Sequence, residues 1–470
     1  LKAEHLLMNP LKKIKHIHFV GIGGAGMIGI AYLLLRKGYK VSGSDINKSK
    51  SLGNLKKIGA KVFYTHNERN VGKADLIVTS SAIKTSNPEY RIAKRKGITI
   101  IPRAQMLGSL MRGYESIAIA GSHGKTTTTS MIANIFSEAL LSPTYIVGGK
   151  VLGIGKNSEL GSGNHLIAEA DESDGSFLHL QPDVGVFTNI DNDHLSYYDN
   201  DIEKLLNSFQ MFAENIPFYG ALIINIDDKN VREVAKKISR RQISFGFSPK
   251  SDYQVTNASY KNNYQIFNLV NNILNKKYLF SLPMPGKHNL YNAAAAIAAS
   301  LEEGIPIKSI QKGLKNFKGV SRRFEKHELI IKKKNLTLID DYGHHPEEIR
   351  STINAIHQAF PKKKICMIFQ PHRYTRTAQL YDDFKDVLSL PDSLLLFDIY
   401  PASEAPIKGI SSKKLLESIK QDGHLNAKLT SNKSILDDIK NSYMDFDILV
   451  SQGAGSISSV CEIIKKKWQK

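Results

Sequence analysis

A chain of 470 residues is too long for one hydrophobic core, so its length predicts several domains. Its apolar content of 41% and charged content of 23% are those of a globular protein. No apolar run reaches the roughly eighteen residues that a membrane span needs. The net charge of +20 comes from lysines in scattered pairs and triples without interleaved aromatics, which favours anionic substrates over nucleic acid.

The cysteine usage predicts a reducing compartment. Cys366 and Cys461 are far apart in the chain and form no C-x-x-C spacing, which argues against a disulfide framework or a zinc–thiolate site. The first residues, "LKAEHLLMNPLKK", have neither a long apolar core nor a small-residue cleavage site, so no signal peptide is expected. We therefore expect a cytoplasmic protein.

The first part of the chain is predicted to be an α/β domain that ends near residue 114 with a helix over 103–113. Its predicted strands are 17–22, 40–45, 61–64, 75–83 and 98–102.

The stretch "GIGGAG" fits G-x-G-x-x-G at Gly21, Gly23 and Gly26, between an apolar strand and a helix-like run. Asp45 ends the next strand at the spacing of the dinucleotide fingerprint. Glycines there permit a tight turn and let a phosphate approach the helix N-terminus. The motif indicates a phosphate-bearing ligand and leaves a nicotinamide-dependent oxidoreductase open.

A second series begins with "IAIAGSHGKTTTTSMIANIF", which places Gly121, Gly124, Lys125 and Thr126 between a strand and a helix. In a phosphate-binding loop, backbone N–H groups wrap a phosphate, a lysine reaches its oxygens and a hydroxyl ligates Mg²⁺. A dehydrogenase has no use for this loop, whereas an ATP-driven enzyme does. Further strands are predicted at 165–171, 184–190 and 220–227, followed by a helix over 288–304.

A third series follows "GVSRRFE", with strands predicted at 336–342, 364–370, 393–400 and 446–457. The chain is thus predicted to be an α/β protein of three domains. These are an N-terminal Rossmann-like domain over 1–114, a central phosphate-loop domain over 115–321 and a C-terminal Rossmann-like domain over 322–470.

Eight motifs occur in order: "GSHGKTTTT", "AEADESDGSFL", "TNIDNDHL", "PGKHNLYNAAAAIA", "GVSRRFE", "IDDYGHHP", "FQPHRYTRT" and "SQGAGSI". Together they resemble the Mur ligase family of peptidoglycan synthesis, over all three domains. The resemblance implies a UDP-sugar-binding domain, a central ATPase and an amino-acid-binding domain. With "GIGGAGM" and "DDYGHHP" it further implies ATP- and Mg²⁺-dependent joining of L-alanine to the lactyl carboxylate of UDP-N-acetylmuramate through an acyl phosphate, by a monomer or homodimer. The motifs depart from the family at Ser122, Gln105, Asp191 and Asn192, and the last three are given no role.

The resemblance and the loop chemistry assign residues to roles. Catalysis is assigned to Lys125, Glu169, His194 and His344. Mg²⁺ coordination is assigned to Thr126, Glu169 and His194. ATP binding is assigned to Gly121, Ser122, His123, Gly124, Lys125, Thr126, Thr127, His288, Asn289, Asn292 and Arg322. Substrate binding is assigned to Gly21, Gly23, Gly24, Ala25, Gly26, Asp45, Tyr342, Arg373 and Arg376.

Simpler alternatives stay open for several of these positions. His194 could be structural, and Glu169 could cap a helix or face solvent. "GKHNLYN" could be a polar helix start, Arg322 could form a surface ion pair, and "DYGHHP" could be a helix-capping turn before Pro346. Other functions also stay open: an oxidoreductase, a nucleotide-gated binding module, or a family member that adds a tripeptide to the same sugar.

Overall fold

The computed structural model describes residues 11, 13–80, 82–152, 156–193, 195–423 and 426–469. They form two compact units. The first comprises the chain up to Ser259, Ile266–Leu282 and Leu290–Lys318, and the second comprises Tyr260–Gln265, Pro283–Asn289 and the chain from Gly319 on. Within the described residues the strands make three sheets, each accompanied by helices, which confirms the predicted α/β fold class.

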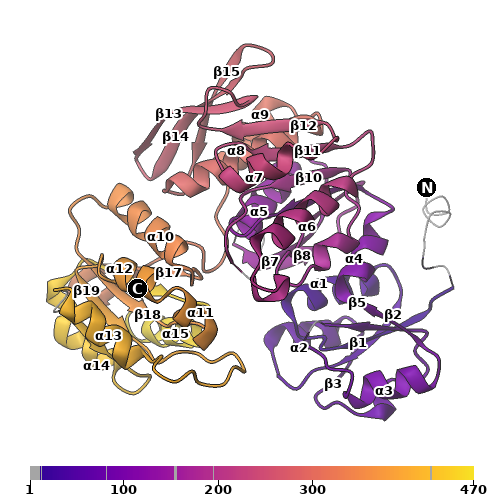
Figure 1. Ribbon diagram of the computed structural model, residues 1–470, viewed down its shortest axis with the longest axis horizontal. Helices are drawn as coiled ribbons and strands as arrows, with labels where there is room; N and C mark the ends of the chain where they lie inside the picture. Colours follow the sequence, from indigo (N-terminus) through magenta and orange to yellow (C-terminus); the bar gives the residue numbers. More distant parts are fainter. Residues whose placement is uncertain are drawn as a thin grey trace. The chain divides into compact units, whose positions relative to one another are not determined.

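The first sheet has the strand order β3-β2-β1-β4-β5, and all its strands run parallel (Figure 1). The strands are β1 (His16–Val20), β2 (Lys40–Ser44), β3 (Lys61–Phe63), β4 (Leu76–Thr79) and β5 (Thr99–Pro102). The helices are α1 (Ala25–Arg36), α2 (Lys50–Lys57), α3 (Pro88–Arg95) and α4 (Arg103–Met111). The strand order reverses between β1 and β4, and ligands of such sheets bind at the carboxyl ends of the strands beside this reversal.

The second sheet has the order β15-β14-β13-β12-β11-β10-β6-β9-β7-β8. Its parallel strands include β6 (Glu115–Ala120), β7 (Thr144–Val151), β9 (His165–Glu169), β10 (Val184–Phe187), β11 (Ala221–Asn225) and β12 (Gln242–Gly246). The remaining strands are β8 (Lys156–Glu159), β13 (Tyr253–Lys261), β14 (Tyr264–Asn271) and β15 (Lys276–Leu282). The helices are α5 (Lys125–Glu138), α6 (Ile202–Glu214), α7 (Lys229–Ala235), α8 (Lys287–Glu302) and α9 (Ile307–Lys315).

The first two sheets share one compact unit, except for Tyr260–Gln265 at the β13–β14 connection, and α1 packs on both of them. Gly29 of α1 lies so near β7 that an added Cβ would come within 3.1 Å of Ile146 Cγ2. A glycine at this position lets helix and strand approach closely. The first glycine loop and the phosphate loop are therefore held in one body.

The third sheet, in the second unit, has the order β16-β17-β21-β18-β19-β20. Its strands are β16 (Glu325–Ile331), β17 (Lys334–Asp341), β18 (Ile365–Phe369), β19 (Ser393–Leu396), β20 (Ala427–Leu429) and β21 (Ile448–Gln452), all parallel except for the β16–β17 pair. Its helices are α10 (Pro346–Ala359), α11 (Tyr374–Gln379), α12 (Tyr381–Leu388), α13 (Ser412–Gln421), α14 (Ile435–Ser442) and α15 (Ile457–Trp468). Across the described parts of the chain, every helix is too short or too polar to cross a membrane.

Candidate active site

The first glycine loop joins β1 to α1 and is tied to the end of β2. Gly21 has a positive φ of 82°, and the N–H groups of Gly21 and Ile22 donate to the carbonyl of Ser44 at 2.9 and 3.0 Å. The Gly23 N–H donates to Asp45 Oδ2 at 2.8 Å, and a Cβ on Gly23 would lie 2.6 Å from that oxygen. Asp45 thus braces the loop at the site predicted for the UDP-sugar.

Arg103, a residue that sequence reasoning missed, brings a cation to this loop. It opens α4, and an added Cβ on Gly26 would lie 3.2 Å from Arg103 Cδ. Its Nη2 is 3.5 Å from Asp171 Oδ2, in the acidic segment that follows β9. The guanidinium therefore lies between the first glycine loop and the acidic segment of the second sheet. Gly24 caps α1, and the side chain of Ala25 lies outside the described part of the structure.

The phosphate loop joins β6 to α5, as its sequence predicts. Gly121 and Gly124 have φ values of 135° and 87°. A Cβ on Gly121 would collide with the Thr188 hydroxyl, and one on Gly124 would collide with Asn292 Oδ1. Only glycine allows both the conformation and the close approach. Because α5 starts at Lys125, its first N–H groups and the positive end of its dipole face this cradle, which suits a phosphate.

Lys125 is held inside the loop by a buried carboxylate, Glu172. The Lys125 ammonium lies 2.8 Å from Glu172 Oε2 and donates to the carbonyls of Gly121 at 2.5 Å and Ser122 at 3.2 Å. Burial alone would lower the pKa of Lys125, but the carboxylates of Glu172 and Asp171 raise it above its usual value. The lysine is therefore charged and oriented toward the loop. The sequence signal for Glu172 was the acidic run "EADESD", from which only Glu169 was chosen.

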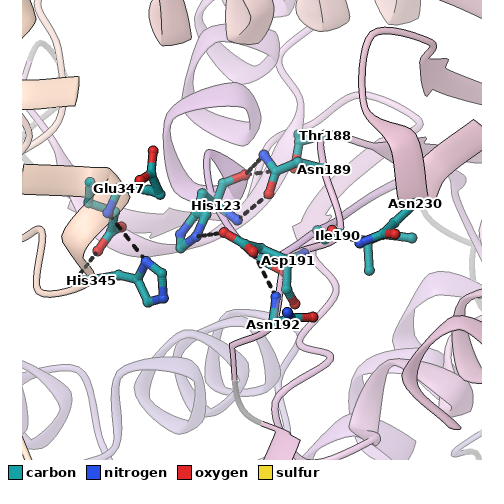
Figure 2. A network of polar contacts seen from close by, with 12 residues as sticks. His123, Thr188, Asn189, Ile190, Asp191, Asn192, Asn230, His345 and Glu347 are labelled. Carbon is teal, nitrogen blue, oxygen red and sulfur yellow. Dashed lines mark hydrogen bonds and ion pairs between the residues drawn. The ribbon is translucent and has the colours of Figure 1, made fainter. Parts of the chain in front are cut away.

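A brace formed by residues 188–191, after β10, fixes the phosphate loop from the other side (Figure 2). Asn189 Oδ1 accepts from the His123 N–H at 2.9 Å, and the Asn189 amide and Thr188 hydroxyl both donate to the His123 carbonyl. The Asp191 N–H donates to Ser122 Oγ at 2.8 Å, and Asp191 Oδ2 lies 3.4 Å from His123 Nε2. The backbone of Asp191 thus explains why a hydroxyl is kept at position 122. It also gives a structural role to a position that the sequence left without one.

Two side chains with hard oxygen atoms, those of Glu169 and Thr126, lie on elements that adjoin the loop. Glu169 ends β9, and its strand partner is Ile119 of β6, immediately before the loop. The Gly148 N–H donates to Glu169 Oε1 at 2.6 Å. Thr126 lies in the first turn of α5. The donor set of a hydroxyl and a carboxylate suits Mg²⁺. His194, the third predicted ligand, lies outside the described residues.

The polar positions at the start of α8 divide between the two units. Asn292 lies against the phosphate loop, where its Oδ1 accepts from Thr128 Oγ1 at 3.3 Å. In the second unit, Asn289 Nδ2 donates to the Pro285 carbonyl at 2.7 Å. Burial lowers the pKa of His288 to about 4, with a smaller contribution from the Arg323 guanidinium. His288 is therefore neutral near pH 7.

In the second unit, cationic and aromatic side chains gather at the carboxyl end of β17. The Arg322 and Arg323 guanidinium carbons lie 5.3 and 5.1 Å from the centre of the Tyr342 ring. Arg322 also donates to Asp340 Oδ1 at 3.1 Å and to the Gly453 carbonyl at 2.6 Å. The ion-pair alternative for Arg322 is therefore observed, with a buried partner rather than a surface one.

The turn "DYGHHP" contains a helix cap, which confirms that alternative for His345. Its side chain accepts from the Glu347 N–H, and Glu348 completes a capping box ahead of Pro346. His344 is oriented differently: its Nδ1 lies 3.2 Å from the Tyr342 carbonyl. Because a carbonyl accepts, this contact is a hydrogen bond when Nδ1 carries the hydrogen, and in the neutral imidazole that tautomer has its lone pair on Nε2.

Arg373 and Arg376 lie at the beginning of α11, after β18. Arg373 precedes the helix with a φ of 74°, so only Arg376 is helical and the predicted shared helix face does not extend to Arg373. Arg376 is buried and donates to His372 Nδ1 at 3.4 Å. Arg373 Nε is buried and has no hydrogen-bonding partner among the described residues. An anionic group would satisfy this N–H.

Comparisons with known proteins agree with this geometry. Sequence models of three parts of the Mur ligase family match consecutively: the Mur ligase catalytic domain over residues 16–115, the middle domain over 119–300 and the glutamate ligase domain over 322–455. A UDP-N-acetylmuramate–L-alanine ligase from Vesicomyosocius okutanii subsp. Calyptogena okutanii is 46% identical over 455 residues, which are 96% of this chain and 97% of the relative.

Two solved structures resemble the whole chain. The UDP-N-acetylmuramate–alanine ligase of Thermotoga maritima superposes with a TM-score of 0.81 at 28% identity and covers 96% of this chain and 98% of its own. A murein peptide ligase from Psychrobacter arcticus reaches a TM-score of 0.71 at 22% identity with the same coverage of both chains, a likeness of fold.

Proposed function

Because the chain belongs to the Mur ligase family, we propose that it joins L-alanine to UDP-N-acetylmuramate with consumption of ATP in peptidoglycan synthesis. The enzyme is an acid–amino-acid ligase. The observation that carries this function is a pair of anion-binding loops in one compact unit, of which only the second holds a lysine. A ligase needs both, since it binds a nucleotide sugar and transfers a phosphoryl group from another nucleotide.

The residues of the phosphate loop fit ATP and Mg²⁺. The glycine cradle at Gly121 and Gly124 leaves room for phosphate oxygens that a side chain would fill. We propose that Lys125 and the first turn of α5 hold the phosphates, and that Thr126 and Glu169 hold Mg²⁺, with His194 as a further ligand. When bound, ATP supplies the phosphoryl group that turns the lactyl carboxylate into an acyl phosphate.

The chain's own contribution to that step is charge and position. A carboxylate and a polyphosphate repel each other, so a cation between them lowers the barrier. Glu172 keeps the Lys125 ammonium in the loop before nucleotide binds, which avoids reorganisation during the reaction. Arg103 places a second cation beside the loop assigned to the UDP-sugar.

We assign the amine half of the reaction to the second unit. A planar guanidinium matches a carboxylate, and Arg373 has an unsatisfied buried N–H, so Arg373 and Arg376 are the proposed clamp for the alanine carboxylate. His344, with its Nδ1 hydrogen on the Tyr342 carbonyl, is the proposed acceptor of the amine proton.

We propose the same division of labour for the domains, with the UDP-sugar bound by 1–114, ATP by 115–321 and the amino acid by 322–470. The two cysteines, Cys366 and Cys461, are buried free thiols, which supports a reducing cytoplasm as the place of action.

The function is tested by phosphate release from ATP with UDP-N-acetylmuramate, with each amino acid and the tripeptide substrate added in turn. Turnover that requires both the UDP-sugar and L-alanine is expected. Turnover with tripeptide alone would move the chain to another branch of the family. ATP hydrolysis independent of the sugar, or a nicotinamide absorbance change without ATP, would overturn the ligase assignment.

A further inference from the structure

One residue, Ser44, connects the first glycine loop to a buried polar row. Its carbonyl accepts the N–H groups of Gly21 and Ile22, and the next residue, Asp45, holds Gly23. Its hydroxyl belongs to the polar row and lies 2.9 Å from Nδ1 of His66. His66 follows β3, so its ring lies at the carboxyl end of β2, beside the loop.

The polar row runs across one face of β1 and β2. Ser42 Oγ lies between His16 Nε2 and His18 Nδ1, at 2.8 and 2.7 Å. Glu89 Oε2 lies 3.3 Å from His18 Nε2 and accepts from the Ser44 hydroxyl at 2.5 Å. Glu89 and Ser44 are completely buried. Buried polar groups of this kind are stable only when each donor hydrogen has an acceptor.

The hydrogens can be assigned from the shortest contact. The Ser44 hydroxyl has one hydrogen, and an ionised Glu89 has none, so this hydrogen lies between the two oxygens. Burial alone would raise the pKa of Glu89, but hydrogen bonds from His18, Ser44 and Asn70 lower it below its usual value. Glu89 is thus ionised. Ser44 Oγ can then only accept from His66, and His66 Nδ1 must carry the hydrogen.

In the neutral imidazole, a hydrogen on Nδ1 leaves Nε2 as a hydrogen-bond acceptor. The His66 side chain is 21% exposed, and because Nδ1 faces the buried pair, the exposed part of the ring carries Nε2. Within the described residues, Nε2 has no hydrogen-bonding partner in the protein. In a sheet of this type the nucleoside extends from the glycine loop over the end of the second strand, which is where His66 lies.

We propose that His66 selects a uracil base by accepting its imino N3–H at Nε2, while Ser44 and Glu89 fix the tautomer that makes this possible. The inference rests on the proposed function, which supplies a uridine nucleotide as the ligand. Uracil carries a hydrogen at N3, whereas cytosine carries a lone pair there. An Nε2 acceptor therefore attracts the first base and repels the second.

The test is calorimetric binding of UDP, N3-methyl-UDP and CDP to the full chain without ATP, for wild type and His66→Ala. Wild type should bind UDP about tenfold more tightly than the other two, the effect of one well-made hydrogen bond. His66→Ala should lose about tenfold in affinity for UDP and little for CDP or N3-methyl-UDP, so that discrimination disappears.

Two variants separate base selection from a structural effect. His66→Gln retains an acceptor oxygen and should recover part of the preference for UDP. Ser44→Ala removes the hydroxyl that accepts the hydrogen of His66 Nδ1, so the ring is no longer fixed in one tautomer. This variant should show a several-fold smaller preference for UDP over CDP, with unchanged affinity for CDP. His357→Ala, at an exposed histidine of α10, is the matched control and should change nothing.

Equal loss of all three ligands in His66→Ala, or an unchanged preference for UDP, would overturn the inference. If wild type ligates alanine but binds UDP and CDP with equal affinity, base selection by His66 is overturned and the proposed function stands. Failure of wild type to bind UDP at all, with no alanine-dependent turnover, would overturn the proposed function itself.

Discussion

The two glycine loops of the first unit have the same strand–loop–helix plan, and side chains of opposite charge close them. At residues 21–26 the side chain that closes the loop is an acceptor, Asp45, whose Oδ2 takes the Gly23 N–H at 2.8 Å. At residues 121–124 it is a cation, Lys125, held 2.8 Å from the buried Glu172. A helix begins directly after each loop, and its first N–H groups suit an anion, so we expect the backbone to bind phosphate at both.

What differs is the capacity for chemistry. A positive charge held in place beside a transferring phosphoryl group lowers the barrier to its transfer, whereas an acidic side chain repels a diphosphate and suits the hydroxyls of a ribose. A glycine motif therefore indicates a loop suited to phosphate, and the charge of the side chain that closes the loop indicates its function.

The largest effect is expected at the second loop. Lys125→Ala should lower the ligation rate about a thousandfold, because it removes the charge aimed at the transferring phosphoryl group. It should also lower the free energy of unfolding by about 3–5 kcal/mol, because Glu172 would remain buried without its partner. Ligation rates and thermal unfolding are the measurements.

The double variant Lys125→Ala/Glu172→Gln controls for that destabilisation. It should unfold near the wild-type temperature and remain inactive. Recovery of activity together with stability would show that the lysine acts only in folding, and the contrast between the loops would lose its basis.

The next effect concerns Asp341, a buried carboxyl group that accepts a hydrogen bond from a glycine N–H, as Asp45 does at the first loop. Asp341 accepts the N–H groups of Gly343 and Phe324, each at 2.8 Å, and burial raises its pKa to about 6. Unfolded, its pKa is about 3.9. Between these values the folded state binds more protons, so its contribution to stability is complete below about pH 4 and falls as pH rises through 6, by about 2–3 kcal/mol.

Denaturant unfolding of wild type and Asp341→Asn across pH 4–7 measures this difference. The free energy of unfolding of wild type should fall relative to the variant as pH rises. Parallel pH profiles would contradict the assignment of a neutral buried carboxyl.

At the first loop, Asp45→Ala should raise KM for UDP-N-acetylmuramate about ten- to a hundredfold, because the brace on Gly23 and one on the Asn47 N–H are both lost. KM for ATP and kcat should stay within a few-fold of wild type. Steady-state kinetics with each substrate varied in turn decides the matter. A fall in kcat with unchanged KM values would place Asp45 in the chemistry instead.

The smallest effect is expected away from both loops. Arg373→Lys keeps the charge and loses the planar fork, so KM for L-alanine should rise about tenfold. Affinity for ATP and for the UDP-sugar should be unchanged. A normal alanine requirement with weakened ATP binding would instead assign the arginine to phosphate.

The sequence predicted those parts of the fold that short-range pattern determines. Apolar runs ending at glycines placed β1, β6 and both loops, and Pro346 after two histidines indicated the turn that His345 caps. The outer strands β12–β15 were not predicted. They contain no motif, and their hydrophobicity does not follow burial: in β14 the buried positions include Gln265 and Asn271, whereas Ile266 is only half-buried.

Site residues were predicted from the sequence only where they lie together in one segment of the chain. Glu172 reaches Lys125 from 47 positions along the chain, and Asp171 reaches Arg103 from 68. Tertiary folding brings those pairs together, and the local spacing of residues does not predict them. The brace at 188–191 was missed for the same reason, although its motif was recognised.

The division between the two loops is tested most directly by calorimetric titration of UDP-N-acetylmuramate and ATP separately into Asp45→Ala and Lys125→Ala/Glu172→Gln. We predict that the first variant loses affinity for the UDP-sugar and retains its affinity for ATP, and that the second variant loses affinity for ATP and retains its affinity for the UDP-sugar. A variant at either loop that weakens both ligands equally, or wild-type protein that binds NAD more tightly than the UDP-sugar, would contradict it.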